Sequence, residues 1–278
     1  MILIADSGST KTEWCVADKG APVMRLFTKG INPYFQTAEE IGKDIEASLL
    51  PSIRSLSIEA VWFYGAGCAS AEKQQIVADA ISALLPASSI EVHSDLTGAA
   101  RALCRRQAGI ACILGTGSNS CLYDGSAIVS NVSPLGYILG DEGSGAVLGK
   151  RLVGDCLKNQ LPGHLIEKFM SRYELTAAVV LERVYKEPFP NRYLAGLSRF
   201  LSENIDEPDI RKLVHQSFRD FFIRNVMQYA GFETYPVHFT GSVAFYYQAT
   251  LKDVARSLDI NIQRIEQTPM PGLLTYHS

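Results

Sequence analysis

The sequence predicts an α/β protein with two domains, and three observations carry this prediction. The chain has 278 residues, whereas a domain typically takes about 150. Two strand–glycine turn–strand units lie 109 residues apart, with Gly8-Ser9 matching Gly117-Ser118. Between them, short apolar runs alternate with helical patterns. We therefore expect a duplicated domain: an N-terminal domain over 1–107 and a C-terminal domain over 108–278 that carries helical additions.

Each repeated unit has the same plan. In the first, the apolar run 2–5 leads into DSGSTKT and then into a second β-like run at 14–17. In the second, the run 111–114 leads into GTGSNS and then into 121–123. Glycine reaches backbone conformations that tight turns need. Both units are therefore expected to be hairpin-like.

The remaining pattern places further strands and helices along the chain. Short apolar runs predict strands at 60–64, 90–93 and 237–240. Apolar residues at helical spacing predict helices over the ranges 71–85, 96–106, 144–158, 191–203 and 209–230.

Composition excludes several classes of function. A net charge of −3 without a basic stripe argues against nucleic acid. Neither a leader nor an apolar run of membrane-spanning length is evident, so we expect a cytoplasmic protein with no membrane partner. The six cysteines lie mostly in apolar stretches and form no CxxC pair, which is typical of reduced, buried thiols. The five histidines form no cluster with metal-ligand spacing.

Two stretches come close to familiar nucleotide motifs. SGAVLGKR, residues 144–151, approaches a P-loop, but Ser144 replaces the first glycine and Arg151 stands where Ser or Thr would bind magnesium. GAGCAS, residues 65–70, lacks the third glycine of a dinucleotide fingerprint. Neither stretch predicts a nucleotide site.

The two hydroxyl-bearing turns have the composition that phosphate chemistry needs. Glycines let backbone N–H groups approach phosphate oxygens closely, and hydroxyls add further donors. Lys11 adds a positive charge. We therefore expect the phosphates of a nucleotide to bind residues from both turns: Gly8, Ser9, Thr10, Lys11, Gly115, Thr116, Gly117 and Ser118.

Four motifs resemble those of a known family. DSGSTKTEW, GTGSN, GDEGSG and FTGS occur in this order over nearly the whole chain. They are similar to the two phosphate motifs, the sugar loop and the adenosine motif of the N-acetylglucosamine kinases. Together with the BadF/BcrA-type ATPases, that family belongs to the actin-like sugar kinase superfamily.

The resemblance implies two ribonuclease-H-like domains of the actin-like ATPase fold, with ATP, Mg²⁺ and a sugar in the cleft between them. Asp95, in HSD at the end of a predicted strand, matches the family's catalytic base. A carboxylate in that role orients a sugar hydroxyl and takes its proton during phosphoryl transfer. The alternative is that Ser94 or Asp95 only caps a helix.

The resemblance also implies sugar contacts. Asn32 in KGINPYF, Asn119 in GTGSN and Asp141 in GDEGSG match positions that bind sugar hydroxyls. Amide and carboxylate groups can bridge neighbouring hydroxyls with fixed geometry. Each also has a simpler interpretation as a turn or cap residue. Glu142 is expected either to cap the following helix or to support the site from behind.

Metal and adenine positions follow from the same resemblance. Asp6 is expected to hold Mg²⁺ through water beside the γ-phosphate, since magnesium usually keeps several waters. Small residues match the adenine side of the site, where they leave room for the base: Gly241, Ser242, Ala195 and Gly196. The simpler alternative for Asp6 is an aspartate that forms a turn, and for the adenine-side positions it is a glycine at the start of a helix.

The sequence departs from the family at one position. The mammalian type carries a Trp-Gly pair ahead of GDEGS, whereas this chain has Leu135-Gly136. A flat aromatic wall of the sugar pocket is thus expected to be replaced by a smaller aliphatic one. This change puts the specificity for the acetamido group in question, but not the kinase chemistry.

The predicted function is an ATP-dependent sugar kinase for N-acetylglucosamine or a related amino sugar or hexose. Two alternatives stay open. One is a BadF/BcrA-type ATPase activator, which needs a cysteine at a subunit face; Cys68 is the one loose candidate. The other is a non-catalytic sugar-sensing protein. The expected partner is a small sugar, and the sequence leaves open whether the chain forms a homodimer.

Overall fold

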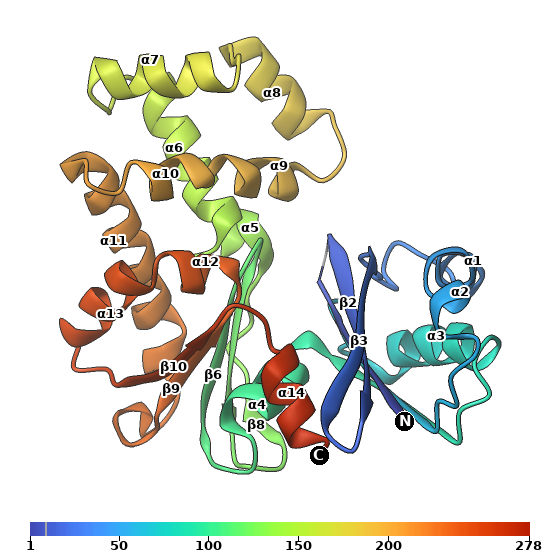
Figure 1. Cartoon of the computed structure of the whole chain (residues 1–278). Helices are drawn as coiled ribbons and strands as arrows, with labels where there is room; N and C mark the ends of the chain where they lie inside the picture. The colour runs from blue at the N-terminus through green and yellow to red at the C-terminus, as the bar shows by residue number, and fades with distance from the viewer. Residues whose placement is uncertain (9) are drawn as a thin grey trace. The chain divides into compact units, whose positions relative to one another are not determined.

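The computed structural model describes residues 1–8 and 10–278 and contains two five-stranded sheets (Figure 1). The first has the order β3-β2-β1-β4-β5. Its strands are β1 (Ile2–Ser7), β2 (Lys11–Asp18), β3 (Ala21–Lys29), β4 (Ala60–Gly65) and β5 (Ser89–Ser94). β2 is antiparallel to β1 and β3, while β4 is parallel to β1 and β5. The carboxyl ends of β1, β4 and β5 therefore lie at one edge of this sheet.

Helices cover both faces of the first sheet, because β1 alternates its side chains between two cores. Leu3 and Ala5 pack in a cluster with α1 (Ala38–Ser48), α2 (Leu50–Ile53) and α3 (Ala71–Ser82). Ile4 packs on the opposite face, in a cluster with residues of α4 (Asp95–Cys104) and α14 (Met270–Tyr276).

Two glycines let the helices of the second face approach closely. A Cβ at Gly98 of α4 would stand 2.9 Å from the Tyr64 side chain, and a Cβ at Gly272 of α14 would stand 2.3 Å from the Ala102 carbonyl oxygen. Helix α4 is therefore fixed between β4 and α14. Its first residue, Asp95, is positioned by this packing.

The second sheet has the order β10-β9-β6-β7-β8. Its strands are β6 (Gly109–Leu114), β7 (Ser118–Tyr123), β8 (Ile128–Ser130), β9 (Val237–Thr240) and β10 (Ile262–Glu266). The helices between β8 and β10 are α5 (Gly136–Leu139), α6 (Gly145–Leu157), α7 (Gly163–Arg172), α8 (Ala177–Tyr185), α9 (Pro190–Leu197), α10 (Arg199–Glu203), α11 (Pro208–Arg224), α12 (Ser242–Tyr246) and α13 (Gln248–Arg256), with 3₁₀ turns at Val226–Gln228 and Phe232–Thr234.

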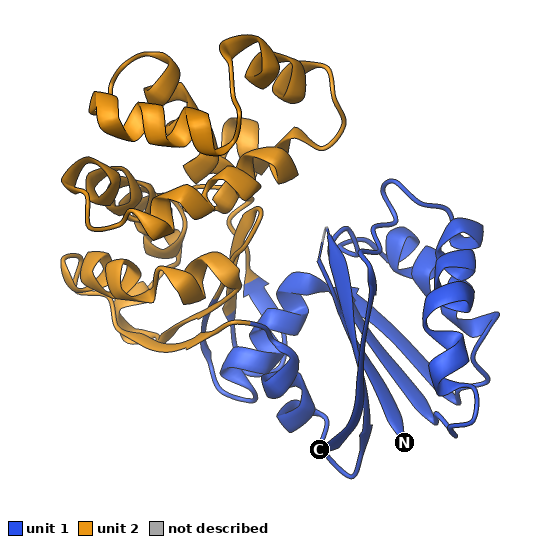
Figure 2. Cartoon of the chain, turned by 45° about the horizontal axis from the view of Figure 1, so that its top comes forward, with its two compact units in different colours: residues 1–111, 123–129, 268–278 blue, residues 112–122, 130–267 orange. Residues whose placement is uncertain are grey.

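The chain divides into two compact units, coloured separately in Figure 2. Unit 1 comprises Met1–Ala111, Tyr123–Val129 and Thr268–Ser278, and unit 2 comprises Cys112–Leu122 and Ser130–Gln267. The end of the chain therefore belongs to the same unit as its beginning. These units are groups of contacting residues, so the domain ranges 1–107 and 108–278 stay a prediction.

Every strand and helix named from the sequence is present, but two helical ranges were wrong in extent. The predicted helix 191–203 is interrupted at Ser198, whose N–H donates to the Ala195 oxygen and which separates α9 from α10. The predicted helix 209–230 ends at Arg224. There the Asn225 side chain donates to the Phe221 oxygen, a local bond of the kind by which Asn competes with helical structure.

Candidate active site

The first glycine turn connects β1 to β2 in unit 1. The Gly8 N–H donates to the Lys11 oxygen at 3.0 Å, which closes the turn. The Lys11 ammonium lies 5.1 Å from the centre of the Phe27 ring. Thr10 is exposed at the turn, and Ser9 lies outside the described residues. The turn thus presents an exposed hydroxyl and a cation immediately after Asp6.

Asp6 has an unusual electrostatic environment for a carboxylate. Its pKa is raised to about 7, chiefly by burial and then by the carboxylates of Asp95 and Glu13, while Lys11 acts in the opposite direction. Some of its surface stays accessible to solvent. A divalent cation would relieve the repulsion, because hard cations prefer carboxylate oxygens. The Asp6 carboxylate therefore fits a role in holding Mg²⁺ through water.

Asp95 stands at the junction of β5 and α4. The helix cap is made by Ser94, whose Oγ accepts the Thr97 N–H at 3.1 Å. Asp95 Oδ1 accepts the N–H of the next residue, Leu96, at 2.8 Å. Burial raises the pKa of Asp95, and this backbone hydrogen bond partly offsets the effect. Ser94 is therefore the N-cap residue, while Asp95 accepts one first-turn N–H through Oδ1 and can use Oδ2 in another role.

Asn32 follows β3 and is held in a compact turn. Its Oδ1 accepts the Tyr34 N–H at 3.0 Å, and its own N–H donates to Gln36 Oε1 at 2.9 Å. The N–H of the preceding residue, Ile31, donates to Ser7 Oγ at 3.0 Å. A Cβ at Gly67 would stand only 2.4 Å from Asn32 Oδ1. The loop after β4 therefore supports the amide at close range.

The second glycine turn connects β6 to β7 in unit 2 and is held by several hydrogen bonds. The Gly115 N–H donates to the Gly117 oxygen at 2.9 Å. At the start of α6, the N–H groups of Gly145 and Ala146 donate to the oxygens of Gly115 and Thr116, at 2.8 and 3.1 Å. This turn is therefore seated on a helix N-terminus, where the backbone dipoles favour anions.

Asp141 is attached to the same turn. Its Oδ1 accepts the Ser118 N–H at 3.2 Å, and its backbone adopts a left-handed conformation with φ 54°. The pKa of Asp141 is raised to about 6, chiefly by burial and further by the neighbouring Glu142 carboxylate, while the hydrogen bond from the Ser118 N–H lowers it. Glu142 itself is held by Arg224 Nε at 2.8 Å and by the Asn225 side chain at 3.3 Å. The end of α11 therefore holds Glu142, and with it the segment that carries Asp141.

The other predicted sugar-side residues of unit 2 precede Asp141 in sequence. Asn119 Oδ1 accepts the Ser120 N–H at 2.9 Å and the Asn131 amide at 3.0 Å. Leu135 is 59% exposed with φ 59°, and Gly136 begins the short helix α5. An aliphatic side chain thus stands exposed six residues before Asp141.

A pocket of about 580 Å³ lies within unit 2 and gathers three of the four predicted adenine-side residues: Ala195, Gly196 and Ser242. The remaining lining residues are Ser198, Arg199, Ser202, Glu203, Val243, Tyr246 and Tyr247. Gly241 directly precedes Ser242 in the sequence. A Cβ at Gly241 would stand 2.3 Å from the oxygen of Leu114, the residue immediately before the second turn. One wall of the pocket is thereby linked to the second glycine turn.

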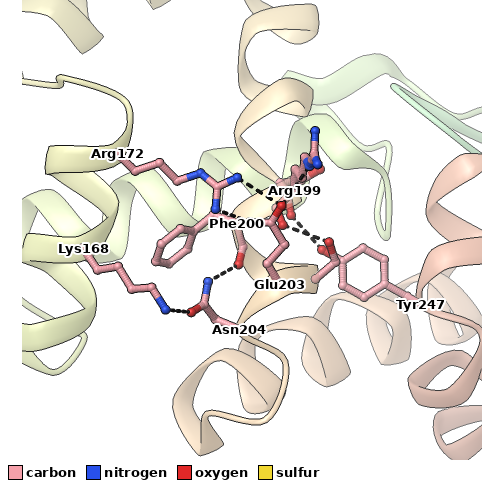
Figure 3. A network of polar contacts seen from close by, with 9 residues as sticks. Lys168, Arg172, Arg199, Phe200, Glu203, Asn204 and Tyr247 are labelled. Carbon is pink, nitrogen blue, oxygen red and sulfur yellow. Dashed lines mark hydrogen bonds and ion pairs between the residues drawn. The ribbon is translucent and has the colours of Figure 1, made fainter.

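Sequence reasoning missed the polar wall of this pocket. Arg199 and Glu203 bond to one another, and Glu203 also bonds Arg172 of the neighbouring helix α7, in the network of Figure 3. The stretch SRFLSE carries the signal, because a Ser pair and an Arg–Glu pair each recur at a spacing of four directly after Ala195-Gly196.

Comparison with known proteins identifies the family. The sequence profile of the BadF/BadG/BcrA/BcrD ATPase family matches residues 5–274. The chain belongs to this family. Membership in an ATPase family implies ATP as the nucleotide. The family resemblance predicted from the four motifs is confirmed.

Solved structures similar to this ATPase-family chain include a candidate N-acetylglucosamine kinase of Porphyromonas gingivalis. It is 51% identical with a TM-score of 0.97, and the alignment covers 100% of this chain and 98% of that one. A candidate N-acetylglucosamine kinase of Chromobacterium violaceum is 17% identical, with a TM-score of 0.76 and coverages of 100% and 99%. The ethanolamine utilization protein EutJ of Carboxydothermus hydrogenoformans is 15% identical, with a TM-score of 0.56 and coverages of 99% and 89%.

The two more distant structures show the fold alone, and no curated protein matches the chain. The predicted α/β fold of the actin-like ATPase type is confirmed, with two mixed five-stranded sheets. In the described part of this ATPase-family chain, no helix has both the length and the apolar character needed to cross a membrane. The assignments of individual site residues stay predictions.

Proposed function

We propose that the chain is an ATP-dependent sugar kinase whose acceptor is N-acetylglucosamine or a related amino sugar or hexose. The observation that carries the proposal is the state of Asp95: its carboxylate stands at the head of α4 while Ser94 makes the helix cap. The 51% identity to the P. gingivalis candidate kinase, over the whole chain, supports the acceptor class.

In the proposed reaction, Asp95 accepts the proton of the sugar hydroxyl as that oxygen attacks the γ-phosphorus of ATP. A phosphorus–oxygen bond forms to the sugar, the bond to the bridging β,γ-oxygen breaks, and ADP leaves with that electron pair. Asn32, Asn119 and Asp141 orient the sugar hydroxyls. Mg²⁺, when bound through Asp6, neutralises charge on the transferring phosphoryl group.

The nucleotide is assigned to the second turn and the pocket beside it. Phosphate oxygens meet the turn formed by residues 115–118, which is seated on the N-terminus of α6. The adenosine part of the nucleotide enters the pocket that Ala195, Gly196 and Ser242 line, because small residues leave room for it there. Lys11 and Thr10 of the first turn contribute further phosphate contacts.

The burial of Cys68 disfavours the electron-transfer alternative. All six cysteines are buried, and Cys68 has no exposed surface. Burial and the nearby Asp95 charge raise the pKa of the Cys68 thiol to about 12. An iron–sulfur cluster is bound by exposed, deprotonated thiols at the site it occupies. A sulfur in this state does not suit such a cluster.

The function is tested by coupled ADP release with N-acetylglucosamine, glucosamine and glucose, against a control without sugar. We expect sugar-dependent ADP release. ATP hydrolysis that is independent of sugar, by a coloured iron-containing protein, would support the activator. Sugar binding without ADP release would support the sensor.

Asp95→Asn and Ser94→Ala form a matched pair that separates catalysis from capping. Asp95→Asn should keep ligand binding but lower kcat by about 10²-fold or more, as expected for loss of a general base. Ser94→Ala should lower the free energy of unfolding by about 1 kcal/mol through loss of the cap, and should change kcat by only a few-fold. Near-normal turnover in Asp95→Asn would remove Asp95 from the chemistry.

A further inference from the structure

The polar wall of the pocket is built around one carboxylate. Glu203, at the end of α10, is held by both terminal nitrogens of Arg172, with Nη2 at 3.0 Å from Oε1 and Nη1 bonded to Oε2. Arg199 Nε donates to Oε1 at 2.9 Å. Figure 3 shows Arg172 reaching Glu203 from a neighbouring helix. These three bonds fix the carboxylate in one orientation.

The carboxylate retains the capacity to accept another hydrogen bond. An ionised carboxylate offers about four acceptor sites, and three are used here. Glu203 lines the pocket, and its side chain is 33% exposed. The contact with Arg172 is the main cause that lowers the pKa of Glu203, so the group is ionised at neutral pH. The pocket therefore contains a fixed, charged acceptor.

The hydroxyl groups on the same wall donate their hydrogen atoms to backbone oxygens of the protein. Ser198 Oγ donates to the Ala195 oxygen at 2.7 Å, and Ser202 Oγ donates to the Arg199 oxygen at 2.8 Å. The Tyr247 hydroxyl donates to the Ser198 oxygen at 2.7 Å. Oxygen atoms of this wall therefore favour a ligand group that donates hydrogen bonds.

The position of Glu203 relative to the phosphate turn indicates which part of a nucleotide it meets. A Cβ at Gly145 would stand 3.2 Å from the Ala195 Cβ and 3.4 Å from Ser198 Oγ, and the Gly145 N–H binds the Gly115 oxygen. Ala195 and Ser198 thus lie beside the phosphate end. Since a helix rises about 1.5 Å per residue, Glu203 lies roughly 7 Å from Ser198 along the axis of α10.

The opposite wall runs outward from the same turn. Gly241 packs against the Leu114 oxygen beside the turn, Ser242 begins α12, and Tyr246 ends it with 66% of its surface exposed. In a nucleotide the ribose separates the phosphates from the base. If the phosphates lie at the second turn, the base therefore lies at the far ends of the two walls, between Tyr246 and Glu203.

We infer that Glu203, clamped by Arg172, recognises the exocyclic 6-amino group of the adenine base. This inference rests on the proposed function, and it assigns a specificity-determining residue to the nucleotide pocket. Arg172 is a positioning residue, because it acts on the base through Glu203.

The inference is tested by titration calorimetry of the full chain with Mg²⁺ and two nucleotides. One is ADP, and the other is the diphosphate of purine riboside, in which hydrogen replaces the 6-amino group. Wild type should bind ADP about 10-fold or more tightly than the analogue, since a hydrogen bond to a charged group is lost. Glu203→Ala should bind the two equally, and Arg172→Met should show an intermediate preference.

Two controls identify other roles for the carboxylate. Glu182→Ala, which removes an exposed carboxylate from α8, should keep the wild-type preference for ADP. 2′-Deoxy-ADP tests the ribose, and Glu203→Ala should leave the ratio of ADP to 2′-deoxy-ADP affinities unchanged. Glu203→Ala should also fold, because Arg172 and Arg199 are 38% and 76% exposed and regain water.

The outcomes separate the inference from the proposed function. If Glu203→Ala binds nucleotide and still prefers ADP over the 6-hydrogen analogue, Glu203 does not recognise the amino group. If the substitution instead abolishes only the preference over 2′-deoxy-ADP, the carboxylate binds the ribose, and the inference is overturned. In both cases the kinase proposal stands. A wild-type protein that binds neither diphosphate would overturn the proposed function and the inference together.

Discussion

The two glycine turns have related sequences but different surroundings. The first is closed by a hydrogen bond from the Gly8 N–H to the Lys11 oxygen, accepts the Gly30 N–H at the Thr10 oxygen, and lies beside the mutually repelling carboxylates Asp6 and Asp95. The second is held by its own Gly115–Gly117 bond and by two N–H groups from α6. Composition alone predicts phosphate contacts for both turns. The carboxylates beside the first turn favour a cation there, whereas the second turn is seated on the N-terminus of α6 and holds the Asp141 carboxylate on its Ser118 N–H.

The difference also concerns which residues each turn positions. In unit 1, the nearby groups are carboxylates whose pKa values are raised by burial, and proton transfer is the chemistry that such groups perform. In unit 2, the turn fixes Asp141 through the Ser118 N–H, which favours binding of a ligand in a set geometry. We therefore expect substitutions near the first turn to change how the free energy of unfolding depends on pH. Substitutions near the second turn should instead change the affinity for the sugar.

The largest expected effect in this comparison is on stability, in Asp6→Asn. The folded-state pKa of about 7 lies above the ordinary value of 3.8, so the contribution of the neutral carboxyl is present below pH 3.8 and is lost as pH rises through 7. The free energy of unfolding of Asp6→Asn should therefore increase relative to that of wild type between pH 5 and pH 8, by on the order of 2 kcal/mol. Urea unfolding at both pH values measures this gain.

Exposed Asp18→Asn serves as the control for loss of one charge in the same sheet. If the difference between Asp6→Asn and wild type does not change with pH, Asp6 does not have the pKa raised by burial and by neighbouring carboxylates. The first turn would then resemble the second in its electrostatics.

An intermediate effect is expected on sugar affinity, in Gly117→Ala. A Cβ at Gly117 would stand 3.0 Å from Asp141 Oδ2, so the carboxylate must shift by a few tenths of an ångström. We expect the KM for sugar to rise about 10-fold, because small displacements of orienting groups are costly.

Two other glycines provide matched controls for this experiment. A Cβ at Gly115 would meet nothing within 4 Å, and a Cβ at Gly8 would meet only the Lys11 oxygen at 3.8 Å. Gly115→Ala should keep the sugar KM near wild type, and Gly8→Ala should change the free energy of unfolding by less than about 0.5 kcal/mol. Equal increases of KM in Gly115→Ala and Gly117→Ala would show that Asp141 is not the group affected.

The smallest expected effect concerns the acetamido preference and Leu135→Trp. The indole adds an apolar face that can pack on the sugar ring or the acetyl methyl, a contact worth about 1 kcal/mol. Wild type should therefore accept a broad range of amino sugars and hexoses, and Leu135→Trp should shift kcat/KM toward N-acetylglucosamine by several-fold. Ile138→Trp, at a residue that is 71% exposed on the same short helix, is the control. A wild-type preference above about 10³-fold for the N-acetyl sugar would assign the acetyl pocket to another residue.

The elements predicted from the sequence are those with strong local signals. Both hairpins were predictable because buried apolar runs flank glycine turns, and α6 because its apolar residues repeat at helical spacing. β3 and β10 carry weaker signals, since the exposure of β3 alternates over much of its length and β10 is only partly buried. α1 was missed although Thr37 and Glu40 form a capping box, which is a readable signal.

The candidate site divides in the same way. Short motifs give the turns, Asp95 and Asp141, because each lies next to a recognisable strand or helix end. The clamp on Glu203 depends on Arg172, 31 residues earlier in the sequence. No local pattern indicates such a pair, because its spacing is set by the packing of α7 against α10. Likewise, no local signal indicates that α14 packs against α4, since that contact depends on Gly272 fitting against Ala102.

The return of α14 to unit 1 has a consequence for synthesis of the chain. Met270 and Leu273 fill a core with Ile4 and Tyr64, and His277 Nε2 bonds the Tyr64 hydroxyl at 2.8 Å. While the ribosome makes residues 112–267, one face of the first sheet lacks its last helix, and apolar side chains around Tyr64 stay uncovered. Unit 1 can finish folding only when the segment 268–278 has left the exit tunnel. Strand β1 therefore waits for a helix made more than 260 residues later, and unit 2 is free to fold during that interval.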